Sequence, residues 1–96
     1  MCTMIVHQAK IDGSGKGANG WFPVQQVNVS YDHPFHAPLE NALNIDFVNE
    51  AQGPGARVAV ELSAEAARSL VEAIHAVLAR AEASGDLEIA ASPEPG

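Results

Sequence analysis

The segment over residues 64–83 has a helical repeat of apolar residues, and the need to bury that repeat most constrains the fold. The repeat has three- and four-residue spacing, which places its members on one face of a helix. Those members are Ala66, Leu70, Ile74, Val77, Leu78 and Ala81. Ser63 is a typical N-cap, and Ser84-Gly85 is a typical helix end. A single amphipathic helix needs a second layer to pack on, so the pattern predicts a helix lying on a sheet.

Four segments before the helix have the alternation or the β-branched content of strands. We expect strands over residues 2–11, 24–33, 42–49 and 57–62. Alternation brings one apolar set to a common face, namely Ile5, Val27, Val29, Leu43, Ile45, Phe47, Val58, Val60 and Leu62. Consecutive strands with short links favour an antiparallel sheet. The prediction is therefore an α+β fold, a ββββα two-layer sandwich whose C-terminal helix covers this face.

A chain of 96 residues is long enough for one domain. We expect a single α+β domain over residues 1–83 and a flexible, acidic, proline-containing tail over residues 84–96. Residues 12–23 hold four of the eight glycines and predict a loop, the most mobile internal segment. The glycines spell GxGxxG from Gly15 to Gly20, but a strand follows where a nucleotide-binding helix should begin, so no nucleotide site is expected.

The charge balance excludes several partners. A net charge of −7 argues against nucleic acid and against an anionic membrane surface, because both need basic residues. Apolar runs fall short of the roughly 20 residues that span a bilayer, and the first residues lack the basic region of a signal peptide. One cysteine excludes an internal disulfide. These features predict a cytoplasmic protein.

Two histidines three residues apart carry the strongest chemical signal. His33 and His36 lie in a segment that Pro34 and Pro38 stiffen, and imidazole is the commonest transition-metal ligand. We predict that these histidines bind a divalent metal ion, either Zn, Fe or Cu. The predicted function is that of a metal-dependent protein, and an enzyme that acts on a small molecule is one form of it. Glu40 is the candidate catalytic base, acting on a metal-bound water, or an oxygen ligand.

His7 is the candidate third metal ligand, although it lies on the apolar face and also suits a core-edge histidine. The apolar faces of the first two strands match when paired residue numbers sum to an even value such as 36. His7 then pairs with Val29, about 13 Å from His33 at about 3.4 Å per residue. One ion bridges this gap only with another register, a folded-back loop or a second subunit. Asp32 is expected to orient an imidazole from outside the coordination shell.

The alternative function is a non-catalytic module that binds a small-molecule ligand or a protein, with structural histidines. His75 is expected to be solvated on the outer helix face. Cys2 is either a small packing residue or an N-terminal thiol that chelates or attacks. A homodimer is expected through the second sheet face, which carries Met4, Val6, Val48 and Ala59 among Gln26, Asn28, Asp46 and Glu61.

Three stretches, MCTMIVHQ, YDHPFHAPLENALNIDFVNEA and GPGARVAVELS, resemble a small uncharacterised actinobacterial family, a domain of unknown function. The resemblance extends to residue 83. Members often carry His where this chain has Asn41, so the resemblance implies that a ligand is missing or weakened here. It also implies a bacterial origin, singles out the histidine segment and assigns no catalytic role.

Overall fold

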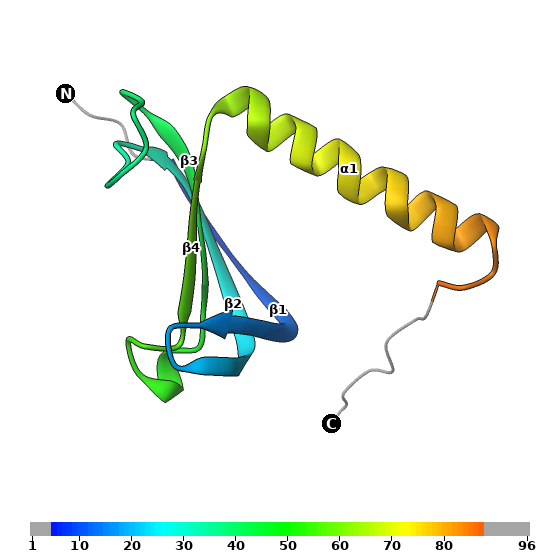
Figure 1. Cartoon of the computed structure of the whole chain (residues 1–96), viewed down its shortest axis with the longest axis horizontal. Helices are drawn as coiled ribbons and strands as arrows, with labels where there is room; N and C mark the ends of the chain where they lie inside the picture. The colour runs from blue at the N-terminus through cyan, green and yellow to red at the C-terminus, as the bar shows by residue number, and fades with distance from the viewer. Residues whose placement is uncertain (1–4, 88–96) are drawn as a thin grey trace.

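A computed structural model describes residues 5–87 (Figure 1). Its elements, in chain order, are β1 (Ile5–Gly17), β2 (Gly20–Asp32), β3 (Ala42–Val48), a 3₁₀ turn (Glu50–Gln52), β4 (Arg57–Leu62) and α1 (Ala64–Ala83). The expectations for Cys2, for Met4 and for the tail beyond residue 87 lie outside the described residues.

The four strands form one antiparallel sheet in the order β1-β2-β3-β4, and a single C-terminal helix follows. This confirms the predicted α+β class. The helix spans the predicted residues, and the Oγ of Ser63 accepts the N–H of Ala66 at 3.0 Å. The cap works because that N–H has no partner inside the helix.

The strand register places the predicted apolar set on one face, which we call the apolar face. His7 pairs with Val29 as predicted, and the row continues through Ile45 to Val60. A second row contains Ile5, Tyr31, Leu43 and Leu62, and a third contains Ala9, Val27, Phe47 and Val58. The opposite side, which carries Glu61, is called the polar face.

The prediction of a loop over residues 12–23 is wrong, whereas the mobility of this segment stays a prediction. β1 runs on to Gly17 and β2 begins at Gly20, so a two-residue turn joins two long strands. Two of the four glycines allow close packing. A Cβ on Gly17 would lie 3.1 Å from the carbonyl oxygen of Arg57, and one on Gly15 would lie 3.0 Å from a methyl of Val24. At these two positions the missing side chain therefore allows close contact within the hairpin and with β4.

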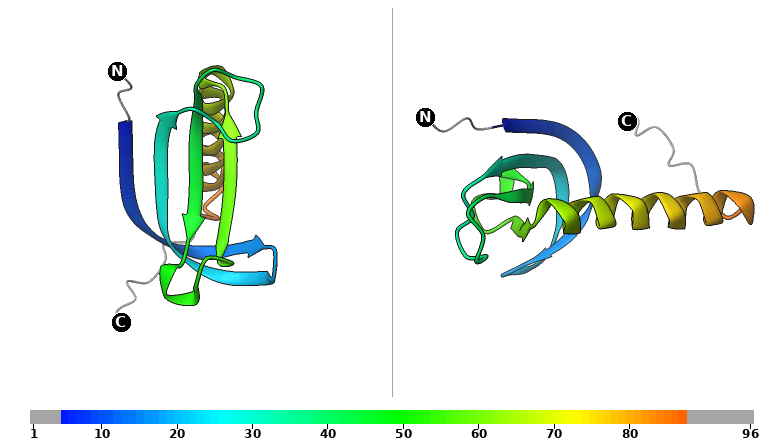
Figure 2. Two further views of the ribbon diagram at one scale, coloured as in Figure 1. Left: turned by 90° about the vertical axis from the view of Figure 1, so that its left-hand side faces the viewer. Right: turned by 90° about the horizontal axis from the view of Figure 1, so that it is seen from above.

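A register shift bends this hairpin over the apolar face (Figure 2). Between the Lys10–Gln26 and Gly13–Val24 pairs, two residues of β1 oppose one of β2, which is the arrangement of a β-bulge. The bend forms the small core, in which Phe22, Val24 and Ala56 are buried against Ile11, Phe47 and Val58.

The helix covers less of the sheet than the two-layer prediction expects. It begins one residue after β4, buries Ala67 and then projects away from the strands (Figures 1 and 2). Its large apolar side chains are 42% to 66% exposed, namely Leu70, Val71, Ile74, Val77 and Leu78. The short connection explains this, because Ser63 alone joins the strand to the helix and is already fixed as the N-cap.

Among residues 5–87, no helix has both the length and the apolar character needed to cross a bilayer.

Candidate functional site

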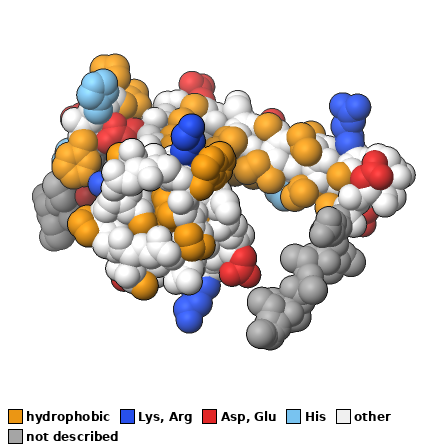
Figure 3. All heavy atoms as spheres, turned by 60° about the horizontal axis from the view of Figure 1, so that its bottom comes forward, with side chains coloured by type: hydrophobic (Ala, Val, Ile, Leu, Met, Phe, Trp, Pro, Cys, Tyr) orange, Lys and Arg blue, Asp and Glu red, His pale blue; other side chains and the backbone are white. Residues whose placement is uncertain are grey.

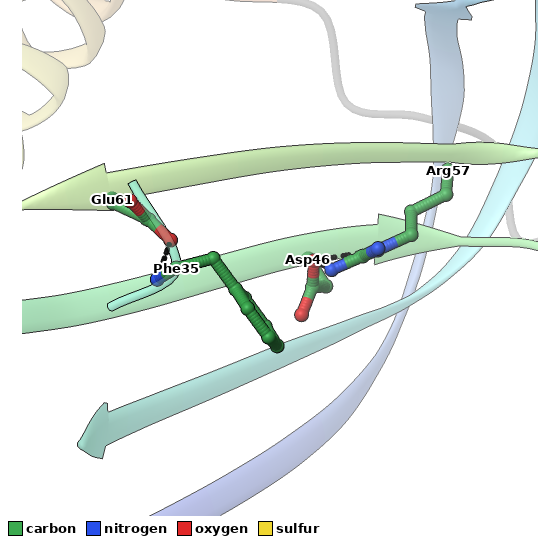
Figure 4. A network of polar contacts seen from close by, with 4 residues as sticks. All are labelled: Phe35, Asp46, Arg57 and Glu61. Atoms are coloured by element: carbon green, nitrogen blue, oxygen red, sulfur yellow. Dashed lines mark hydrogen bonds and ion pairs between the residues drawn. The ribbon is translucent and has the colours of Figure 1, made fainter. Parts of the chain in front are cut away.

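The segment between β2 and β3, residues 33–41, crosses the polar face and is held there by one carboxylate. Glu61 on β4 accepts three backbone N–H groups: Phe35 at 2.6 Å, His36 at 3.0 Å and Ala37 at 2.8 Å. Figure 4 shows the bond to Phe35. Buried or constrained backbone donors need acceptors, and here a side chain supplies them for three consecutive residues. The histidine segment is therefore anchored to the sheet.

These hydrogen bonds set the charge state of Glu61. The amide donors of Ala37 and Phe35 lower the pKa of Glu61 below its ordinary value of 4.5, and partial desolvation opposes them less strongly. Hydrogen bonds to the ionised form favour that form. The carboxylate is thus negative at neutral pH, which strengthens its bonds to the loop.

His33 is oriented by the backbone of the same segment. Its Nδ1 lies 2.9 Å from the carbonyl oxygen of Glu40, and because a carbonyl can only accept, Nδ1 carries the proton and donates. Asp32 contacts the main chain of His33, because its carboxylate accepts the backbone N–H of His33 at 2.7 Å. Glu40 takes part through its main chain, while the residue as a whole is exposed.

The sheet separates His7 from the other two predicted metal ligands, His33 and His36. His7 shares the apolar face with Val60, whereas the adjacent Glu61 points to the polar face, where it bonds the backbone of His36. His33 and His36 stay within one short segment. In the described part of the chain, no three His, Cys, Asp or Glu side chains group so that they could hold a metal ion. The metal site remains a prediction.

Other polar side chains on the polar face pair with one another. The guanidinium of Arg57 lies 2.8 Å from the carboxylate of Asp46 (Figure 4). Gln26 donates to Asn28 at 2.7 Å. Phe35 lies above this face with 97% of its surface exposed. The face on which the homodimer prediction was based is therefore occupied in part by the chain's own loop and ion pair.

Sequence reasoning missed the anchoring role of Glu61, which it counted only as a polar residue of the second face. Its role depends on a contact with residues 24 to 26 positions earlier, and nothing local marks that contact. The one available signal is the pair of prolines at positions 34 and 38. They flank three N–H groups that the strands leave unpaired, so an acceptor from elsewhere is needed.

A groove separates the start of the helix from the apolar face. It has a volume of about 710 Å³ and is lined by Tyr31 and Leu43 from the sheet and by Ala67 and Val71 from the helix, with Arg68 and Glu72 also on the helix side. Figure 3 shows hydrophobic side chains continuing along the projecting helix. Several large apolar side chains thus stay exposed along the groove and the helix.

The fold and the anchored loop define a class: a small α+β protein with a four-stranded antiparallel sheet, a partly covered apolar face and a projecting C-terminal helix. The chain belongs to the family of unknown function DUF6295, whose model matches residues 1–87. No curated protein matches it, and no solved structure does. Membership of a family of unknown function is as predicted, whereas the bacterial origin stays a prediction.

Proposed function

We propose that this protein is a non-catalytic interaction module that forms a homodimer through its apolar face and its helix. The observation that carries the proposal is the exposure of large apolar side chains on the helix and on the sheet beside the groove. Val77 on the helix is 66% exposed, and Ile5, whose strand partner Tyr31 lines the groove, is 63% exposed. A large exposed apolar surface typically marks a protein interface.

The two sheet faces differ in what association would cost. On the polar face, a partner would have to displace or desolvate the Arg57–Asp46 pair and the bonds that Glu61 makes. Desolvating charged groups is unfavourable unless they are paired again. On the apolar face, the same burial removes hydrocarbon from water, which is favourable. The proposed dimer therefore uses the face opposite to the one predicted from sequence.

Light scattering combined with a pair of matched variants tests this proposal. We expect a mass of about 20 kDa, twice the chain mass of 10.0 kDa. Ile5 and Val6 are neighbours on β1, are 63% and 51% exposed, and point to opposite faces. Ile5→Glu should weaken association by about tenfold or more, because it puts a charge on the apolar face. Val6→Glu should leave the dimer intact.

Two results would contradict the proposal. One is a mass of 10.0 kDa at every protein concentration. The other is dissociation by Val6→Glu with no effect of Ile5→Glu, which would return the interface to the polar face. Far-UV circular dichroism of each variant checks that the fold is retained.

A metal-binding function is the second candidate, and the orientation of His33 favours it. Its Nδ1 donates to the Glu40 carbonyl, so a neutral His33 ring would ligate a metal through Nε2. Glu61 holds the same segment, including His36, in place. In this proposal His33 and His36 bind Zn, Fe or Cu, Glu40 activates a bound water, and His7 joins only from a second copy. A cytoplasmic location and a small-molecule ligand belong to the same set of predictions.

Elemental analysis of untagged protein purified without chelator tests the metal proposal. We expect about one transition metal per chain, as a single two-histidine site with added ligands would hold. His36→Ala should lower the content, and His75→Ala, on the exposed helix, should not. Protein without metal that also takes up no Zn²⁺, Fe²⁺ or Cu²⁺ would refute the proposal.

A further inference from the structure

We infer that the groove over the apolar face is filled by α1 of a second copy of this chain, so that two copies exchange their helices. The inference rests on the proposed homodimer and specifies its interface, in which α1 of one chain packs on the apolar face of the other chain. A contact of helix on helix, or of sheet on sheet, would satisfy the proposed function but not this inference.

The two surfaces match in chemistry. The exposed stripe of the helix consists of Leu70, Val71, Ile74, Val77 and Leu78, all uncharged and aliphatic. At 3.6 residues per turn these side chains share one side of the helix with the buried Ala67. The floor of the groove is made by Tyr31 and Leu43, and the row beside them continues the apolar face. Each chain thus carries both an apolar helix and an apolar surface for a helix.

A chain cannot lay its own helix along its own apolar face. Only Ser63 separates Leu62 at the end of β4 from the start of α1, and the Ser63 hydroxyl caps the helix at 3.0 Å. Ala67 is already packed against the sheet. Folding the helix back would break the cap and withdraw Ala67, so within one chain the helix leaves the apolar face uncovered beyond Ala67.

The buried area favours a second copy over an unrelated partner. The part of the helix beyond Ala67, residues 68–83, is about 24 Å long and about 10 Å wide, so pressing it along its stripe covers about 240 Å². A reciprocal exchange makes two such contacts, and each chain loses about 480 Å² through its helix and its sheet. The total of about 960 Å² exceeds most crystal-packing contacts and approaches the roughly 1,000 Å² of a specific interface, whereas one contact alone gives half of this.

Symmetry supports the same occupant. If one helix entered a neighbour's groove without reciprocation, each chain would keep one free helix or one free groove, and the contact would repeat into a filament. A two-fold axis closes the arrangement, because both helices and both grooves are then used. The dimer is the smallest closed assembly in which every groove and every helix stripe is used.

Complementation between two variants tests this directly. Tyr31→Glu places a charge in the groove, and Ile74→Lys places one on the stripe. Each variant alone should fail to dimerise, since every exchanged contact then holds one defect. In an equimolar mixture, one contact is intact and the other holds both defects with opposite charges. The mixture should therefore regain a mass of about 20 kDa by light scattering, against a chain mass of 10.0 kDa.

Ser30→Glu and Ser69→Lys are the matched controls, because Ser30 points to the polar face and Ser69 lies on the helix side away from the stripe. Both should dimerise alone. If either test variant loses its circular dichroism signal, the milder pair Tyr31→Ala and Ile74→Ala replaces it. A dimeric wild type whose variants do not recover on mixing would overturn the helix exchange and leave the homodimer standing. A monomeric wild type would overturn both.

Discussion

The carboxylate of Glu61 on β4 accepts the backbone N–H of Phe35 at 2.6 Å across 26 positions of sequence. The same carboxylate bonds His36 and Ala37, so one side chain on an edge strand determines where the histidine segment lies. Any chemistry of His33 or His36 depends on this anchor. The anchor also keeps the loop on the polar face, which is opposite to the apolar face that we propose for association.

Glu61→Ala should release the loop without unfolding the sheet. The amides of Phe35, His36 and Ala37 lose their acceptor, and hydrogen exchange at these three positions should become faster by about tenfold or more, while exchange in β3 stays unchanged. Asp46→Asn is the control, because it removes the exposed ion pair with Arg57 and leaves the loop contacts intact. Unchanged protection of the three amides in Glu61→Ala would show that the carboxylate does not hold the loop.

The anchor should fail in acid, at a pH below 4.5. The pKa of Glu61 is lower in the folded protein than its ordinary value of 4.5, so the stability that it contributes is fully present above that value. This contribution falls as the pH drops below 4.5 and is lost once the pH passes through the lowered pKa. The measurement is an NMR titration of the Phe35 and Ala37 amides, with Glu61→Gln as the variant that removes the titrating group. A midpoint at or above 4.5 would contradict the prediction.

Gly17→Ala should destabilise the protein, whereas Gly13→Ala should not. A Cβ at Gly17 would lie 3.1 Å from the Arg57 carbonyl and 3.2 Å from the ring of Phe22, and a backbone neighbour cannot easily move. Overpacking of this kind costs about 1–3 kcal/mol of unfolding free energy. At Gly13 nothing lies within 4 Å, so alanine should change that free energy by less than about 1 kcal/mol. Chemical denaturation measures both, and equal stabilities would show that the hairpin is not packed tightly on β4.

Asn49→Ala should destabilise the turn that joins β3 to β4. Asn49 is 2% exposed, donates to the carbonyl of Pro23 at 2.9 Å and accepts the N–H of Ala51 at 3.2 Å. Removing one partner leaves a poorly hydrated carbonyl and costs about 1–3 kcal/mol. Gln52→Ala, at an exposed position of the same turn, should stay within about 0.5 kcal/mol of the wild type by denaturation. An unchanged free energy of unfolding in Asn49→Ala would mean that water replaces the side-chain amide.

The sequence predictions are correct where the structure depends on interactions between residues close in sequence or on adjacent strands. The helix bounds are correct because Ser63 and Ser84-Gly85 act within a few residues of the helix ends. The His7–Val29 pair is correct because the apolar pattern of two adjacent strands permits few registers. The hairpin at residues 12–23 was misjudged, since glycine is common both in loops and where two backbones approach closely.

The sequence by itself determined the helix, the presence of four strands, the antiparallel order of the sheet and the set of residues on its apolar face. Each of these depends on local periodicity, capping or the alternation of neighbouring strands. Only the tertiary structure decided that Glu61 anchors the histidine segment, that the sheet separates His7 from His36, and that the helix projects from the sheet. These outcomes depend on contacts between distant parts of the chain and on the single residue between β4 and α1, and a pattern of neighbours does not contain that information.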